Sequence, residues 1–242
     1  MALAHSPRIV RDSLIIYLDA GNAKSYPGSG TTWYDLCGNN DTTINGATYN
    51  SGGYFVLDGT NDYFEVTSDG SSDFAKQTFS IEFWCYIDPD GYDVLWSYDY
   101  TSHSGPTYSQ HWRTGVTYGT DSLYGGSNNG GTFNSTTTVH DNGAFGNTAY
   151  TANKWTQLVW TVGDGGTTKI STFYQDGSSL ETETNTGWSD ITYYNQEVWI
   201  GKANFSTGYY EGNIATVKFY DRALSSQEVT QNFNAHRNRF GV

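Results

Sequence analysis

Several residue types and patterns are scarce in this chain of 242 residues. It has only two cysteines and no C-x-x-C spacing, which excludes a zinc ribbon. No apolar run is long enough to cross a bilayer, so we expect no membrane insertion. The first residues, "MALAHSPRIV", lack the apolar stretch of a signal peptide. We therefore expect synthesis in a cytoplasm without signal-directed export.

Basic residues are also scarce. The chain has 12 Lys and Arg against 25 Asp and Glu, a formal net charge of −13. Sequence-independent binding to nucleic acid needs a basic surface. We therefore expect no nucleic-acid partner.

Aromatic residues and glycine are abundant instead. Aromatics make up 17% of the chain, with 28 Gly and only 4 Pro. Strands alternate apolar and polar positions, and "QTFSIEFWCYID" shows this most clearly. One face of this strand holds Phe79, Ile81, Phe83, Cys85 and Ile87, and the other holds Ser80, Glu82, Trp84 and Tyr86. This pattern predicts that Cys85 is a small buried residue, and it leaves a disulfide to Cys37 open.

Similar strand patterns occur along the chain, and turn signals recur every 8–15 residues. They include "DSLIIYLDAG", "DVLWSYDY", "EVWIGKA" and "GNIATVKFYDRA", and a hairpin in "KWTQLVWTVG…TKISTFYQDG". The region from Thr101 to Tyr150 is rich in Gly, Ser, Thr and Asn, which favours long loops and short strands. We predict an all-β sandwich of two antiparallel sheets in a single domain over residues 1–242, with its core at about 11–235.

One helix is predicted near the C-terminus, in "ALSSQEVTQNFNAHRNRF". Ser225 and Glu228 have the spacing of a capping box, and Leu224 and Val229 that of a hydrophobic staple. Val229 and Phe233 fall on one face at i and i+4. We expect this helix to pack on the sandwich.

The stretch "VLDGTNDYFEV" places Asp58, Asn61 and Asp62 within five residues. Oxygen ligands this close suit calcium, but Asp, Asn and Gly also favour a turn between two strands. We favour a strand-turn-strand unit over a calcium site.

Catalytic motifs are sparse. The sequence has no H-E-x-x-H, no G-x-S-x-G and no P-loop. Glu181 and Glu183 share a strand face as paired carboxylates would in a glycoside hydrolase, but their polar context favours a solvated strand edge. His103, His111 and Asp99 make a weak zinc set. We expect no enzymatic activity.

Clustered aromatic residues are the strongest candidate for a binding site. Flat rings pack on the apolar C–H faces of sugars, while polar neighbours bond the hydroxyl groups. The predicted carbohydrate-binding residues are Trp84, Tyr86, Tyr98, Tyr100, His111, Trp112 and Arg113. Packing inside the sandwich is the competing interpretation for these aromatics, and Trp84 in particular suits a core position.

The order of these motifs resembles laminin-G-like, concanavalin A-like jelly rolls of the lectin and glucanase type. The resemblance rests on "FVLDGTNDYFEV", "TFSIEFWCYI", the "KWTQLVWTVGDGGTTKISTFYQDG" hairpin and "WIGKANFSTGYYEGNIATVKFYDRALSSQEV". It covers residues 11–235 and implies a concanavalin A-like jelly-roll fold with one short C-terminal helix. It also implies carbohydrate binding or adhesion, often with calcium.

Calcium is not assigned. The positions that match the calcium ligands of pentraxin relatives offer only Asp99 and Asn204, and Lys202 opposes a cation. The family often has Asp where this chain has Ala215. The E-x-D-x-x-E strand of the glucanases is absent, so the resemblance does not imply that activity.

The two ends of the chain resemble small laminin-G-like structural proteins of tailed phages, particularly cyanophages. These ends are "SPRIVRDSLIIYLDAGNAKSYPGSGTTWYDLCGN" and "NFNAHRNRFGV". The resemblance implies a virion protein, made in the host cytoplasm, whose partners are a glycan or host-surface polysaccharide and other virion proteins. Two alternatives remain: a purely structural capsid decoration or tail or fibre component, and a glycoside hydrolase.

Overall fold

The computed structural model describes residues 7–67, 74, 78–87, 93–99, 110–117, 122–129, 153–165, 168–185, 197–202 and 208–242. At residues 93, 98–99, 110–117, 122–129, 185 and 197 the structure describes the backbone alone. The strands are β1 (Leu14–Asp19), β2 (Thr32–Trp33), β3 (Thr42–Asn45), β4 (Thr48–Asn50), β5 (Tyr54–Asp58), β6 (Tyr63–Val66), β7 (Phe79–Ile87), β8 (Asp93–Asp99), β9 (Gln110–Thr117), β10 (Ser122–Asn129), β11 (Trp155–Asp164), β12 (Lys169–Gln175), β13 (Ser178–Asn185), β14 (Glu197–Ile200) and β15 (Glu211–Tyr220). One helix, α1 (Ser226–Phe240), follows them.

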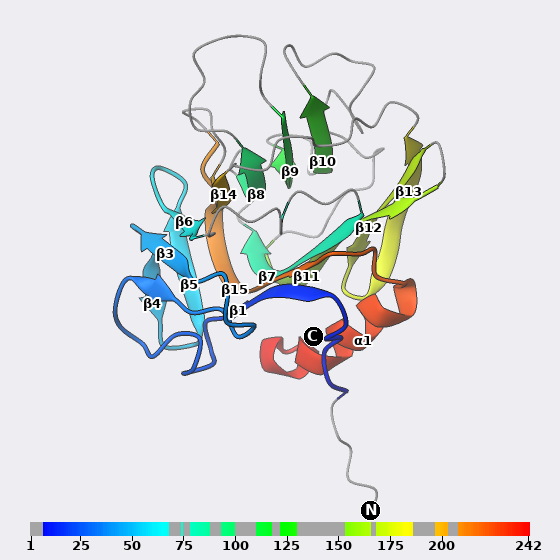
Figure 1. Cartoon of the computed structure of the whole chain (residues 1–242). Coiled ribbons are helices and arrows are strands. Elements are labelled where there is room, and N and C mark those ends of the chain that lie inside the picture. The colour runs from blue at the N-terminus through cyan, green and yellow to red at the C-terminus, as the bar shows by residue number, and fades with distance from the viewer. Residues whose placement is uncertain are drawn as a thin grey trace, which may run out of the picture.

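The described strands form two antiparallel sheets (Figure 1). Sheet A has the order β13-β12-β11-β7-β15-β5-β4, and sheet B has the order β10-β9-β8-β14-β6-β3-β2. Strand β15 is long enough to pair with β5 along its first half and with β1 along its second half. The predicted sandwich of two antiparallel sheets with one C-terminal helix is therefore confirmed.

The core lies between the two sheets and is rich in aromatic rings. Phe55 of sheet A meets Phe64 of sheet B at a ring-centroid distance of 5.1 Å. Trp96 of sheet B stacks on Phe219 of sheet A at 5.5 Å. Cys85 is buried in the same cluster, as predicted. Cys85 and Cys37 are not joined by a disulfide bond in the structure.

The turn in "VLDGTNDYFEV" carries the chain from one sheet to the other. Strand β5 belongs to sheet A and β6 to sheet B, and Gly59 between them has a φ of 72° that favours glycine. The Asp58 carboxylate accepts hydrogen bonds from the backbone N–H of Thr60 at 2.8 Å and of Asn61 at 3.4 Å. An Asp62 oxygen accepts from the Asp58 N–H at 3.1 Å. The predicted strand-turn-strand unit is confirmed, with its carboxylates bonded to the turn backbone.

Helix α1 covers the outer face of sheet A (Figure 1). Its predicted capping box is present: Ser225 caps the Glu228 N–H, and the Glu228 carboxylate accepts from the Ser225 N–H. Val229 is fully buried in a cluster with Leu224. The helix ends at Gly241, which is in the left-handed conformation. The expected packing role of this helix is confirmed.

A buried ion pair lies beneath the helix. Glu82 of β7 and Lys218 of β15 are neighbours in register, both have fully buried side chains, and Lys218 Nζ lies 2.7 Å from Glu82 Oε1. Asn232 of α1 donates from Nδ2 to the other Glu82 oxygen at 2.6 Å. Burial is the largest single influence and favours the neutral carboxyl group, but the charge and hydrogen bond of Lys218, together with His236 and a hydrogen bond from Gln157, outweigh it and lower the pKa of Glu82. The face of β7 opposite the core, which carries Ser80, Glu82 and Trp84, is thus buried as well.

The N-terminal segment joins the same network. The Val10 N–H donates to Asn232 Oδ1 at 2.8 Å, and the Tyr220 hydroxyl donates to the Val10 carbonyl at 3.2 Å. The two ends of the described chain therefore pack against each other over sheet A. Within the described ranges, no helix combines the length and apolar character needed to cross a lipid bilayer.

We predict that Lys218→Met will lower the free energy of unfolding by about 3–5 kcal/mol, because it leaves the buried Glu82 charge without its partner. Urea unfolding followed by tryptophan fluorescence measures this change. The double variant Glu82→Gln/Lys218→Met removes both charges and keeps a hydrogen-bond acceptor for Asn232, so it should recover most of the loss. A double variant no more stable than the single one would contradict this account.

We also predict an acid-sensitive contribution from His236, whose Nε2 lies 3.2 Å from the Tyr17 hydroxyl. Burial, reinforced by the charge of Lys218, lowers the pKa of His236 from 6.5 to about 4. The unfolded chain therefore takes up the proton first as the pH falls, and stability is lost progressively between pH 6.5 and about 4.

The measurement is the melting temperature at several pH values across this range, for the parent chain and for His236→Gln. The variant should show a flatter profile, since it removes the group that titrates. Parallel profiles for the two proteins would show that His236 is not responsible.

Candidate functional site

Trp84, a predicted site residue, is buried beneath helix α1. Its exposed fraction is 0%, and its indole stacks on Phe240 at 4.4 Å and lies parallel to Phe233 at 5.8 Å. No ring face is left for a sugar, so the predicted binding role of Trp84 is wrong and the packing interpretation holds. The helix that covers it comes from a distant part of the sequence.

Tyr86 lies farther along the same face of β7 and is half-buried. It meets Trp155 edge-on at 6.2 Å, and Trp155 in turn contacts Tyr54 at 5.2 Å and Phe240 at 4.9 Å. This aromatic cluster flanks the end of α1 on sheet A. Trp84 and Tyr86 are therefore on sheet A, whereas the predicted residues Tyr98, His111, Trp112 and Arg113 are on strands of sheet B.

The remaining predicted residues belong to the segment around β8 and β9. Tyr98 pairs in register with Trp112 and with Val198, a core residue of β14. Arg113 pairs with Ser97, which pairs with Trp199. Tyr98 and Trp112 are thus cross-strand neighbours in sheet B, and Arg113 belongs to the adjacent cross-strand pair. Tyr100 and His103 lie outside the described residues, and for His111 only the backbone, in β9, is described.

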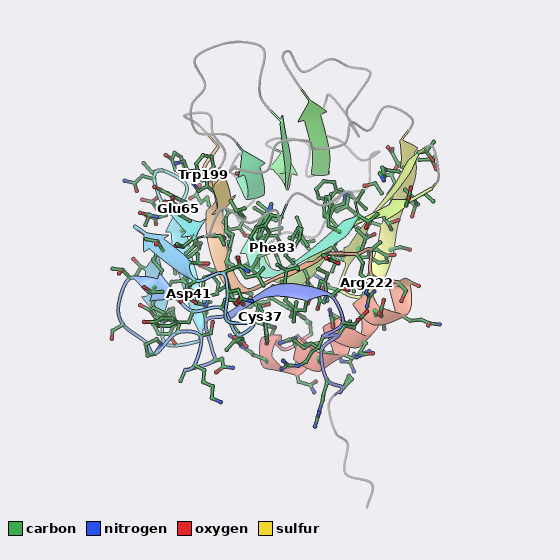
Figure 2. All side chains as sticks on the ribbon, in the orientation of Figure 1. Cys37, Asp41, Glu65, Phe83, Trp199 and Arg222 are labelled. Carbon is green, nitrogen blue, oxygen red and sulfur yellow. The ribbon has the colours of Figure 1, made fainter. Side chains whose placement is uncertain are left out.

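A candidate binding surface lies on the outer face of sheet B. We call it the Trp199 face and define it by Tyr63 and Glu65 of β6, Trp199 of β14, and Lys202 and Tyr209 just beyond. Figure 2 shows Trp199 and Glu65 close together on these two strands. The same strands direct Phe64, Val66, Val198 and Ile200 into the core.

Strand alternation explains why these residues face outward. In "YFEV" and "EVWI" every second side chain is buried in the core, so Tyr63, Glu65 and Trp199 lie on the opposite face. Gly201, with a φ of 79°, ends β14. Lys202 and Tyr209 then form an antiparallel bridge that returns the chain to this surface.

The geometry of the Trp199 face centres on an ammonium group held between rings. Lys202 Nζ lies 4.2 Å from the centroid of Tyr63 and 4.5 Å from that of Trp199. Tyr209 lies 6.4 Å from Tyr63. The Ser97 hydroxyl donates to the Lys202 carbonyl at 2.7 Å, which fixes the backbone at this point. Trp199 is 3% exposed, and the other four residues are half-buried.

This arrangement offers three kinds of contact to a ligand. The tyrosine rings offer flat apolar surface, Lys202 offers hydrogen-bond donors, and Glu65 offers acceptors. The loop-centred sequence prediction missed all five residues. The signal was available in "EVWIG", because the apolar Val198 and Ile200 identify the inward face and leave Trp199 on the other.

Other candidate chemistry is weaker in the described part of the chain. Those residues contain no group of three or more His, Cys, Asp or Glu side chains arranged to hold a metal ion. Glu181 and Glu183 share a face of β13 and are half-buried, and β13 is an edge strand of sheet A. This confirms the edge position and the shared face, although the neighbouring threonines are more exposed to solvent than the two glutamates.

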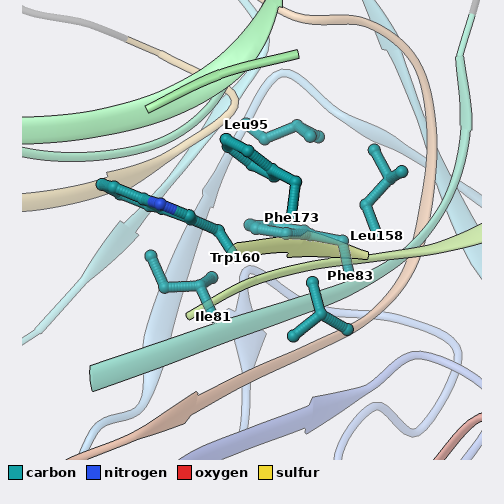
Figure 3. Close-up of a pocket in the computed structure, with 7 residues that line it drawn as sticks. Ile81, Phe83, Leu95, Leu158, Trp160 and Phe173 are labelled. Atoms are coloured by element: carbon teal, nitrogen blue, oxygen red, sulfur yellow. The ribbon is translucent and has the colours of Figure 1, made fainter. Parts of the chain in front are cut away.

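A cavity lies between the sheets but is too small for a sugar. Its volume is about 10 Å³, near the lower limit for one water molecule. Figure 3 shows its apolar lining, which among the described residues comprises Ile81, Phe83, Leu95, Leu158, Val159, Trp160 and Phe173. It is a packing defect of the core, and its described lining consists of apolar side chains.

Solved structures with a similar fold include proteins with different activities. A Trypanosoma rangeli sialidase mutant with trans-sialidase activity matches at a TM-score of 0.64 and 16% identity, over 95% of this chain and 34% of the sialidase. The binding domain of botulinum neurotoxin DC, solved with rat synaptotagmin II, matches at 0.58 and 15%, over 92% of this chain and 51% of the neurotoxin chain. This chain thus spans about a third of the sialidase, and the identities establish the fold alone.

A third structure matches over nearly its whole length. Domain 4 of AbnA, a GH43 extracellular arabinanase from Geobacillus stearothermophilus solved with arabinotriose, matches at a TM-score of 0.63 and 17% identity. The match covers 91% of this chain and 98% of that domain. A search of curated proteins found no significant sequence match. The family model of the concanavalin A-like lectin/glucanases superfamily matches residues 58–230, more than half of the sequence. The chain therefore belongs to the concanavalin A-like lectin/glucanases superfamily.

Proposed function

We propose that this domain is a non-enzymatic carbohydrate-binding or adhesion module that holds glycans at the Trp199 face. The observation that carries the proposal is the placement of two half-buried tyrosine rings, an ammonium group and a carboxylate together on the outer face of sheet B. The family and the arabinotriose complex of the arabinanase domain support the same class of ligand. The fold alone does not determine the function.

The proposed contacts follow from the chemistry of a sugar ring. Tyr63 and Tyr209 contact its apolar C–H face, and Lys202 and Glu65 hydrogen-bond its hydroxyl groups. The centre of sheet A is less suited to binding a sugar, because helix α1 covers Trp84 there. The Trp155 cluster beside Tyr86 is the competing surface, since its rings are also half-buried.

We predict that the purified protein will bind at least one glycan on an array and that Tyr63→Ala will weaken this binding about tenfold or more, as loss of a central tyrosine does at other interfaces. Tyr86→Ala is the matched control, because it removes a half-buried tyrosine from sheet A. Trp112→Ala tests the predicted β9 residue in the same experiment. Absence of any bound glycan would contradict the proposal, and loss of binding in Tyr86→Ala alone would move the site to sheet A.

We further propose that the domain is a component of a phage virion, made in the host cytoplasm, and that its glycan ligand is a host-surface polysaccharide. The support is the resemblance of both chain ends to phage structural proteins. These ends pack together through Val10 and Asn232, so the resemblance rests on one continuous part of the fold. A purely structural role in a capsid decoration or in a tail or fibre is compatible with this location.

We predict that mass spectrometry of purified particles of the encoding phage will detect this protein. It should remain with the particles through a density gradient, as other virion proteins do. Its presence in the infected-cell lysate but not in the particles would contradict the virion proposal and leave the glycan-binding proposal standing.

A further inference from the structure

The pairing of lysines in this chain shows what is unusual about Lys202. Lys154 lies 2.7 Å from Asp176, Lys169 lies 3.6 Å from Asp164, and Lys218 is paired with Glu82. These are the other half-buried or buried lysines among the described residues. Lys202 is also half-buried, yet its ammonium contacts two rings and no described carboxylate.

A shortage of acidic residues does not explain this. The chain has 25 acidic residues against 12 basic ones, and Glu65 lies on the same face as Lys202. The Glu65 backbone is the register neighbour of Trp199, whose ring Lys202 covers. Even so, the structure gives no ion pair between Glu65 and Lys202. The ring faces hold the ammonium by cation–π attraction, and no carboxylate among the described side chains accepts a hydrogen bond from it.

The position of this ammonium is fixed before any ligand arrives. The Ser97 hydroxyl and the bridge to Tyr209 hold the Lys202 backbone, and the two rings hold its side chain. A preorganised charge loses less entropy on binding than a mobile one. A second basic residue, Arg113 of β9, pairs in backbone register with Ser97 of β8, which in turn pairs with Trp199 of β14.

We propose that the Trp199 face selects acidic glycans, in which a carboxylate on the sugar ring pairs with Lys202 while the ring packs against Tyr63. The ligand class is a uronic-acid polysaccharide. This inference rests on the proposed function, because it assigns the charge of the glycan held at the same surface. The net charge of −13 opposes the approach of any polyanion, but salt screens that long-range repulsion beyond about 8 Å at physiological ionic strength. The short contact at Lys202 is screened much less.

The test uses an array of uronic-acid polysaccharides, each printed beside its carboxyl-reduced neutral form, together with neutral glucans, arabinans and galactans, at about physiological salt. The parent protein should bind an acidic polysaccharide about tenfold more strongly than its neutral form, the difference expected from one charge-assisted hydrogen bond. Lys202→Gln should lose this preference, and Lys202→Arg should keep most of it. Lys24→Gln is the control, because it changes the net charge equally at an exposed lysine.

Each result has a distinct meaning. Equal binding of acidic and neutral forms, or an acidic preference that survives in Lys202→Gln, overturns the inference while glycan binding itself stands. An equal loss in Lys24→Gln attributes the preference to net charge and also overturns it. No binding to any glycan removes both the inference and the proposed function. Thermal unfolding of each variant confirms that it is folded.

Discussion

The buried pair of Glu82 and Lys218 sets the arrangement of the layers outside sheet A. Removing each of these two charges from water costs several kcal/mol of desolvation free energy. The attraction between the two charges offsets this cost only when the remaining donors and acceptors of both side chains also form hydrogen bonds. Asn232 meets that need from helix α1, and it in turn binds Val10 of the N-terminal segment. The helix and the N-terminal segment are therefore held in place by the same polar group at the centre of the sheet.

This constraint divides the work between the two sheets. The central strands β7 and β15 are buried on both faces, by the core on one side and by α1 on the other. Aromatic residues on the outer face of these strands, such as Trp84, consequently stabilise the helix. On the outer face of sheet B, Tyr63 and Tyr209 retain partial solvent access. Among the described residues, the two ends of the chain thus pack on sheet A, and partly exposed rings remain on the outer face of sheet B.

The sequence was sufficient to predict the capped helix and the strands with clear alternation, because these depend on local patterns, but it gave no individual prediction for the short strands β2, β3 and β4. Alternation identified both faces of β7, and the Ser225 and Glu228 spacing identified the start of α1. The same alternation does not reveal what covers each face. Trp84 and Trp199 each lie on the outward face of a strand, and only the tertiary position of α1 distinguishes them. The turn after Asp58 is similar, since its residues predict a reversal but not the change of sheet.

Two lysines of this chain make related contacts, and their difference in burial separates structure from binding. Lys218 Nζ lies 5.3 Å from the centroid of Tyr17, and Lys202 Nζ lies over Tyr63 and Trp199. A fully buried ammonium cannot be hydrated, so Lys218 requires the resident counterion Glu82. A half-buried ammonium keeps part of its water and can exchange that water for an anionic group of a ligand. Of these two lysines, Lys202 is therefore the one whose environment, as far as the described side chains define it, suits the reversible binding that we propose.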